Sequence, residues 1–171
     1  MKKIVPEYAF SEEQLNTISN LAAETGLTQH VARILYARGV DTADKIRRFM
    51  HPSKKNFLSP FLMKGMKEAV EMIAAAREEG KTVAVFGDYD VDGITSTCLL
   101  TDYLRSRGAD VTMHIPRRIE EGYGLGCDAI RALSESGVTL IVTVDCGITG
   151  VDETAYAATL GVDLVITDHH E

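Results

Sequence analysis

The sequence predicts an α/β fold, with a parallel sheet of βαβ units flanked by helices and preceded by a small helical region. Two observations carry this prediction. After residue 80, short apolar runs alternate with helix-length segments, which is typical of a parallel sheet covered on both faces. Before residue 80, the chain shows helical periodicity and helix-type ends. The expected domains are residues 1–80 and 81–171.

The first region contains recognisable helix boundaries. Ser11 and Gln14 stand at capping-box spacing, and Gly26 would end that helix. Asp41 is the expected N-cap of a later helix. The expected helices span residues 11–26, 28–39, 41–50 and 64–80, with a connecting loop over 51–61.

The second region contains four strand-type runs, and helices separate them. In a parallel sheet of this kind, ligands bind outside the carboxyl ends of the strands. The expected strands are 81–88, 110–115, 139–145 and 162–168, and the expected helices are 94–108, 126–137 and 151–161.

The charge of the chain is unevenly distributed. The net charge of −7 argues against a nucleic-acid-binding protein that is basic overall. Residues 1–80 carry a net charge of +2 and residues 81–171 a net charge of −9. Bound cations would neutralise part of the negative charge of residues 81–171, or that charge would serve solubility alone.

Cysteine content and the N-terminus predict a cytoplasmic protein. The three cysteines are dispersed and form no C-x-x-C pair, which favours reduced thiols. No apolar run is long enough for a signal peptide or a membrane span.

Carboxylates and imidazoles follow three of the four expected strands. The carboxyl ends of parallel strands meet at one edge of a sheet, so we expect these groups to converge. Each single Asp has an ordinary alternative role as a turn residue or helix N-cap. The residues are Asp88, Asp90 and Asp92 after the first strand, Asp145 after the third, and Asp168, His169 and His170 after the fourth.

This convergence predicts bound divalent cations. On an extended backbone, alternate Asp side chains would lie roughly 6–7 Å apart on one side. Each pair would then repel by about 2–3 kcal/mol at an effective dielectric near 20, and a cation would turn that repulsion into attraction. Oxygen ligands favour Mg²⁺ or Mn²⁺, and an imidazole from His169 tilts the preference to Mn²⁺. Zn²⁺ is less favoured because no cysteine has ligand spacing.

The number of groups suits two ions bridged by a carboxylate, for which Asp145 is the candidate. Adjacent residues of an extended chain point in opposite directions. We therefore expect only one of His169 and His170 to be a ligand, while the other faces the substrate phosphate or packs. Asp168 would orient a histidine by a hydrogen bond without binding the metal itself.

The segments "GDYDVDGITS", "VTVDCGI" and "VITDHH" resemble the first three motifs of the DHH phosphoesterase superfamily. The segments "IPRRIEEGYGL", "VARILYARGVDTADKIRRFM" and "MKEAVEMIAAAREEGKTVAVFGDYD" are similar to RecJ-type exonucleases specific for single-stranded DNA. Pyrophosphatases of the superfamily usually carry a metal-binding His before the first motif. Here "AVFG" around Phe86 stands in that place, which favours the exonuclease branch.

The resemblance implies a role for each site residue. His170 would contact the scissile phosphate and Asp168 would support the histidines. Arg118 and Arg117 would lie near substrate phosphates, unless both are solvated surface residues. The implied metal ligands are Asp90, Asp92, Asp145 and His169, with Asp145 as the bridge. Asp88 would be a further ligand or a carboxylate that contacts the ligands and not the metal.

The resemblance also implies a reaction. Two Mn²⁺ or Mg²⁺ ions would promote release of 5′-terminal nucleotides from single-stranded DNA in repair and recombination, with repair proteins as further partners. Family members continue with a fourth motif, a second domain and an OB-type domain, whereas this chain ends after the third motif. The expectation is therefore an inactive N-terminal fragment of a longer 5′-3′ exonuclease.

Three other functions fit parts of the sequence. The first is a phosphodiesterase for short oligonucleotides or cyclic dinucleotides. The second is a non-catalytic DHH scaffold, which would be expected to lose carboxylates that are intact here. The third is a dinucleotide-binding fold, but no G-x-G-x-x-G follows the first strand. The basic stretch 45–55 would contact a nucleic-acid backbone or, with its charges spaced around a helix, simply be solvated.

Overall fold

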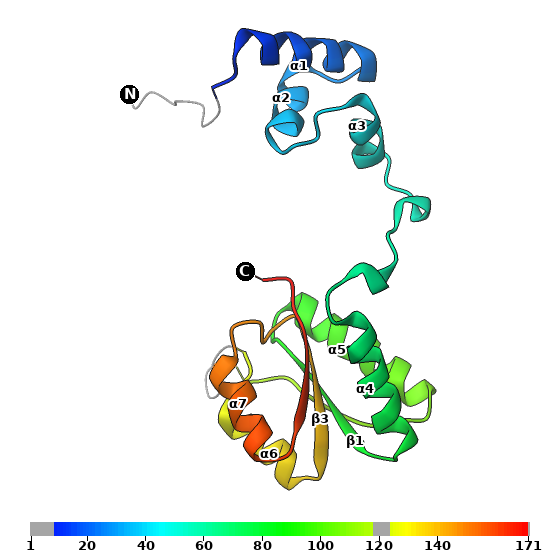
Figure 1. Cartoon of the computed structure of the whole chain (residues 1–171), viewed down its shortest axis with the longest axis vertical. Coiled ribbons are helices and arrows are strands. Elements are labelled where there is room, and N and C mark those ends of the chain that lie inside the picture. Colours follow the sequence, from blue (N-terminus) through cyan, green and yellow to red (C-terminus); the bar gives the residue numbers. More distant parts are fainter. Residues whose placement is uncertain (1–8, 118–123, 171) are drawn as a thin grey trace. The chain divides into compact units, whose positions relative to one another are not determined.

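The computed structural model of the chain describes residues 9–117 and 124–170, which form two compact units (Figure 1). The first unit ends at Ser59 and the second begins at Pro60. The described part of the first unit is helical, and that of the second combines a sheet with helices. The predicted α/β class with a helical lead-in is confirmed.

Three α-helices form the first unit: α1 (Glu12–Thr25), α2 (Gln29–Ala37) and α3 (Ala43–Met50). The predicted capping box of α1 is present, since Ser11 Oγ accepts from the Gln14 N–H and Gln14 Oε1 accepts from the Ser11 N–H. The predicted cap of α3 is wrong. Thr42 caps that helix, while Asp41 is held 2.7 Å from Lys45 Nζ. The core residues are Ile18, Leu21, Ala22, Ala32, Leu35 and Ile46.

The second unit is built on a parallel four-stranded sheet in the order β2-β1-β3-β4. The two inner strands are paired up to Gly87 and Val144, so their carboxyl ends lie side by side. The four predicted strands are confirmed to within one residue at each end. Their bounds are β1 (Thr82–Gly87), β2 (Asp110–His114), β3 (Val138–Val144) and β4 (Asp163–Thr167).

Helices cover both faces of this sheet (Figure 1). Successive side chains of a strand point to opposite faces. Val83 and Val85 of β1 accordingly pack in a core with α4 and α5, whereas Ala84 and Phe86 pack in a core with α6 and α7. The covering helices are α4 (Met66–Glu78), α5 (Val91–Ser106), α6 (Cys127–Glu135) and α7 (Val151–Thr159).

Helix α4 belongs with the sheet and not with the preceding helices. Ala76 is buried in the same core as Val83, and Ile73 packs against that core. The compact second unit therefore starts earlier than the boundary we expect from the sequence between residues 80 and 81. Helical periodicity reveals an apolar face, but it does not reveal which partner covers that face.

The segment between α3 and α4 contains two short 3₁₀ helices, η1 (Lys54–Asn56) and η2 (Pro60–Leu62). The first lies within the predicted loop, and the second ends one residue beyond it. Among the described residues, no helix is both long enough and apolar enough to cross a membrane.

Candidate metal centre

The turn after β1 begins a helix directly, so our prediction of an extended segment over Asp88–Asp92 is wrong. Asp90 is the N-cap of α5, and its Oδ1 accepts from the Gly93 N–H at 3.0 Å. Asp92 lies in the first turn of the same helix. Negative charge at a helix N-terminus interacts favourably with the helix dipole. The local structure therefore supplies part of the stabilisation that we assigned to cations alone.

The three carboxylates of this turn have different surroundings. Asp88 is 2% exposed and its Oδ1 accepts from the Tyr89 N–H at 2.7 Å. Asp90 and Asp92 are exposed. The hydrogen bond from the Gly93 N–H lowers the pKa of Asp90 and outweighs the effect of partial desolvation, so this carboxylate is ionised at neutral pH.

Two glycines allow the turn to lie against its own helix. A Cβ atom at Gly93 would overlap the backbone of Asp88, and one at Gly87 would overlap the side chain of Thr97. Thr97 is fully buried and its Oγ1 donates to the Gly93 carbonyl at 2.7 Å. Close backbone packing thus sets the position of Asp88 relative to α5.

Asp145 follows β3 in a left-handed backbone conformation, with φ of 63°. It is the only non-glycine residue with positive φ in the described part of the chain. Its N–H donates to the Thr167 carbonyl at 3.0 Å, which continues the pairing between β3 and β4. Asp and Asn adopt this conformation more readily than other residues, and such conformations cluster at functional sites.

The carboxylate of Asp145 is buried and incompletely satisfied. Its side chain is 5% exposed, and Oδ1 lies 2.8 Å from His169 Nε2. Oδ2 is buried and has no hydrogen-bond partner among the described residues. Burial and then the nearby Asp90 carboxylate raise the pKa of Asp145, against the opposing effect of His169. A buried acceptor without a partner is costly, and a cation would satisfy it.

His169 and His170 face the same region, and our expectation that only one of them is a metal ligand stays a prediction. Their ring centroids are 4.5 Å apart. Asp168 Oδ1 accepts from both backbone N–H groups, at 2.7 and 3.0 Å, and lies 2.7 Å from His170 Nδ1. Because the chain turns around this carboxylate after β4, the alternation of an extended strand does not apply.

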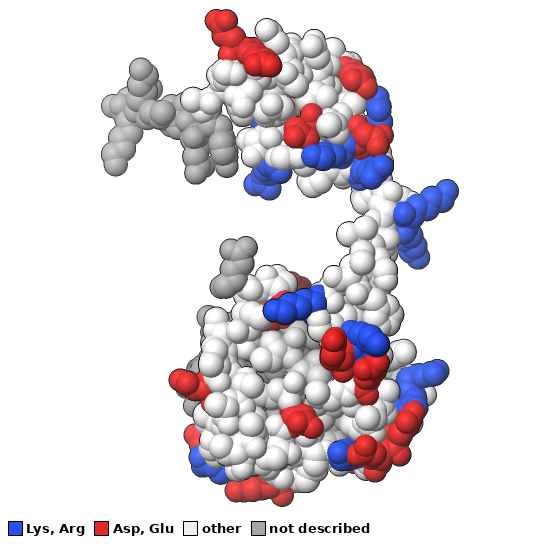
Figure 2. All heavy atoms as spheres, viewed as in Figure 1, with Lys and Arg blue, Asp and Glu red and all other residues white. Residues whose placement is uncertain are grey.

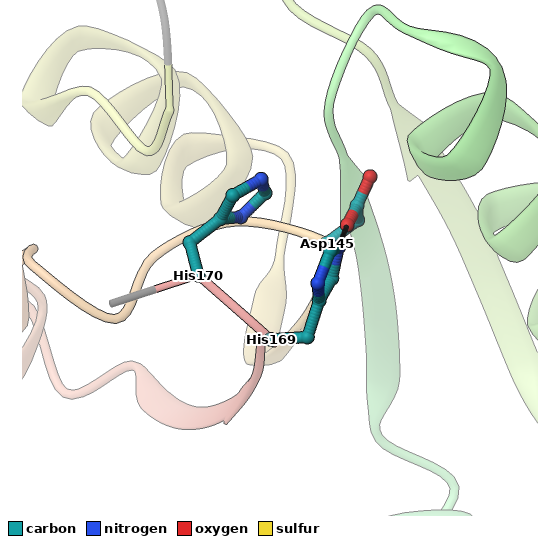
Figure 3. A group of neighbouring side chains, drawn as sticks. All are labelled: Asp145, His169 and His170. Atoms are coloured by element: carbon teal, nitrogen blue, oxygen red, sulfur yellow. Dashed lines mark ion pairs between the residues drawn. The ribbon is translucent and has the colours of Figure 1, made fainter. Parts of the chain in front are cut away.

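Asp145, His169 and His170 form a group that could hold a metal ion (Figure 3). One ligand atom from each residue lies within 4.8 Å of the other two. A carboxylate with two imidazoles suits Mn²⁺ and other first-row divalent ions. The resemblance implies a phosphate contact for His170, whereas the geometry also allows it to be a ligand. The sequence signal for such a turn is the Asp immediately before the two histidines.

The remaining predicted site residues are not members of this three-residue group. Asp90 is close enough to Asp145 that each affects the pKa of the other. Asp88 and Asp168 lie near the buried Cys146 and contribute to its raised pKa. Asp92 is not part of the group found among the described residues.

The two predicted phosphate contacts are not tested by this geometry. Arg117 is exposed at the end of the described segment, and Arg118 lies outside the described residues.

An open cavity of about 510 Å³ adjoins the metal group. Its lining includes Asp145 and His169, together with Met66 of α4 and Ser96 of α5. Lys64, which precedes α4, also lines it. Cavities of this size are typical of small-ligand sites. Ser96 and Lys64 are candidate site residues that the sequence did not single out.

Comparison with known proteins identifies the family. Residues 82–171 match the model of the DHH family, N-terminal domain. Over 154 residues the chain is 44% identical to the single-stranded-DNA-specific exonuclease RecJ of Bacillus subtilis, which covers 90% of this chain and 20% of that protein. The chain thus spans about a fifth of the length of this relative.

Solved structures of RecJ proteins share the fold. One, an exonuclease RecJ bound to manganese, has a TM-score of 0.62 and 41% identity over 67% of this chain and 30% of that one. RecJ of Thermus thermophilus with Mn²⁺ has a TM-score of 0.64 and 30% identity over 92% of this chain and 21% of that one. The same protein with Mg²⁺ has a TM-score of 0.53 and 28% identity over 91% and 18%. The motif residues, the sheet and these matches agree, and the chain belongs to the DHH family.

Proposed function

We propose that this chain is the metal-binding part of a phosphodiesterase that removes nucleotides from the 5′ end of single-stranded DNA in repair and recombination. The observation that carries the proposal is the buried Asp145 carboxylate beside two imidazoles, with one oxygen that no described residue partners. Relatives described as exonucleases specific for single-stranded DNA support the substrate, and RecJ structures with Mn²⁺ and Mg²⁺ support the cofactor.

Asp145, His169 and Asp90 would hold the ions, with Asp145 as the bridge and His170, Asp88 or Asp92 completing the set. Two divalent ions polarise a phosphate and lower the pKa of water. Asp168 holds the ring of His170 through Nδ1, and Nε2 would face an ion or a substrate phosphate. The Arg117 and Arg118 side chains would neutralise further phosphates.

A covalent mechanism through the neighbouring thiol is disfavoured. Cys146 is fully buried, and burial, followed by the nearby carboxylates, raises its pKa to about 12. The thiolate, not the thiol, is the nucleophile.

A protein that acts on DNA in this way would work in the cytoplasm, in contact with repair proteins.

Metal binding tests the first half of the proposal. Titration of the chain with Mn²⁺, followed by electron paramagnetic resonance, should show saturable binding that Asp145→Asn reduces at least tenfold. Asp102→Asn is the matched control, because Asp102 is exposed on α5 outside the metal group. Equal binding by the wild type and Asp145→Asn would overturn the assignment.

Activity tests the second half. Residues 82–171 can replace the matching segment of Bacillus subtilis RecJ, to which the chain is 44% identical. The chimera should release nucleotides from 5′-labelled single strands with Mn²⁺ but not with EDTA, and Asp90→Ala or Asp145→Ala should abolish this. A folded chimera that binds Mn²⁺ yet cleaves only dinucleotides would show the short-oligonucleotide enzyme instead. No cleavage of either substrate would favour a scaffold.

A further inference from the structure

The first unit contains an open groove of about 660 Å³, away from the candidate metal ligands and lined in part by the basic stretch 45–55. It lies between the end of α3 and the segment around η1. Cationic and aromatic side chains form much of its lining, together with Leu58 and Pro52. The cationic and aromatic residues are Lys45, Arg48, Phe49, Lys55 and Phe57.

The aromatic side chains of the groove are unusually exposed. Phe57 is 77% exposed and Phe49 is 60% exposed, and Leu58 beside them is 80% exposed. Scattered apolar residues are normal on a surface, but a cluster of this kind marks an interaction site. The rings are thus available for contact with a partner.

The charge of the groove is positive. Residues 45–64 contain no Asp or Glu, and Figure 2 shows Lys and Arg but no acidic side chains on the segment after α3. Lys45 and Arg48 pair with acidic residues of the same unit, but both pairs are exposed. Exposed pairs contribute little, so a phosphate can replace the acidic partner. Lys55 has no ion pair among the described residues.

The basic residues of α3 do not all face the groove. Arg47 lies 2.9 Å from Glu24 of α1 and does not line the groove. Lys45, Arg48 and Phe49 share the groove with Lys55 and Phe57 from the following segment. A single surface therefore combines cations with flat apolar rings.

We propose that this groove binds single-stranded nucleic acid, with its cations on phosphates and Phe49 and Phe57 stacked on bases. The inference rests on the proposed function for its single-stranded substrate. Single strands expose base faces, and stacking on aromatic rings with a cationic track is how proteins bind them without sequence preference. A second copy of this chain fits less well, because a symmetric contact would bring cationic grooves together.

Fluorescence anisotropy with 5′-fluorescein-labelled (dT)20 in EDTA tests the proposal on the whole chain. Binding should weaken as salt rises, and Lys55→Ala should reduce the slope of log K against log salt by about 0.7. Phe57→Ala should weaken binding by about fivefold or more. Arg33→Ala is the matched control, since Arg33 is exposed on α2 outside the groove. Duplex DNA should bind more weakly than the single strand.

Several outcomes would overturn the proposal: no detectable binding, or Lys55→Ala and Phe57→Ala binding like Arg33→Ala. Equal binding to phosphatidylserine vesicles would show a general anion surface. A dimer that Phe57→Ala dissociates, seen by light scattering, would show a second copy in the groove. Binding of (dT)20 is measured in EDTA, whereas Mn²⁺ binding is measured on the same chain without DNA. Failure of the metal centre and failure of the groove are therefore distinguishable.

Discussion

The carboxylate of Asp168 lies 2.7 Å from Nδ1 of His170 and also accepts from the backbone N–H groups of His169 and His170. Its second oxygen accepts from the Ile148 N–H at 3.0 Å. The Asp168 side chain is 2% exposed, whereas the His170 side chain that it contacts is 42% exposed. One carboxylate thus turns the chain after β4 and orients an imidazole.

The pKa of His170 should fall when Asp168 is changed to Asn. The hydrogen bond from the Asp168 carboxylate raises the pKa of His170, and the neutral amide removes most of that effect. An NMR titration of the His170 ring in the metal-free chain measures the change, with Asp102→Asn as control. An unchanged His170 pKa in Asp168→Asn would contradict this assignment.

This pair should also make stability depend on pH in the absence of metal. The pKa of His170 is raised from 6.5 on folding, so its contribution is full below that pH and is lost as pH rises through the folded value. The pKa of Asp168 is lowered from 3.8: burial opposes this, but hydrogen bonds from backbone N–H groups and His170 outweigh it. Its contribution is lost as pH falls below 3.8. Urea unfolding from pH 3 to 8 should show the wild type losing its advantage over Asp168→Asn at both extremes.

Asp145→Asn and Asp145→Ala should differ in stability although both remove the charge. Asn tolerates the left-handed backbone at this position and relieves the buried charge, so the metal-free variant should be at least as stable as the wild type. Ala is strained there, by roughly 1–2 kcal/mol. Urea unfolding with EDTA checks the order. Equal stability of Asn and Ala would mean that the φ of 63° imposes no strain.

Gly93→Ala should destabilise the chain by about 3 kcal/mol, at the upper end for overpacking. The added methyl group would overlap the Asp88 backbone, so α5 must move away from the turn that carries the predicted ligands. Mn²⁺ affinity should fall with it. Gly126→Ala is the control: its Cβ would meet open space, and the cost at a helix N-cap should be below about 1 kcal/mol. Similar unfolding curves for the two variants would contradict the packing argument.

The cysteines should differ sharply in reactivity. Cys98 is exposed, whereas Cys146 is buried with a pKa raised to about 12. At pH 8, iodoacetamide should modify Cys98 within minutes and leave Cys146 unmodified until the chain unfolds. Peptide mass spectrometry locates the label, and Cys98→Ser removes the fast phase. Rapid labelling of Cys146 in the folded chain would show that the region beside Asp145 opens.

Most of the fold could be predicted because its signals are local. Val83–Phe86 is a continuous apolar run, which marks a strand buried on both faces, and the structure bears this out. The capping residues Ser11 and Gln14 act within one helical turn. The packing partner of α4 could not be predicted, because it depends on contact with strands that follow later in the chain.

The candidate site likewise has features that could be predicted from the sequence and features that could not. The meeting of Asp145 with His169 follows from the order of residues alone, because both follow parallel strands whose carboxyl ends share an edge. Three other features became visible only in three dimensions: His170 joins them, Asp90 caps α5, and one oxygen of Asp145 is buried without a partner among the described residues. The direction of a side chain beyond a strand end depends on hydrogen bonds and burial supplied by other segments. Strand periodicity carries no information about those contacts.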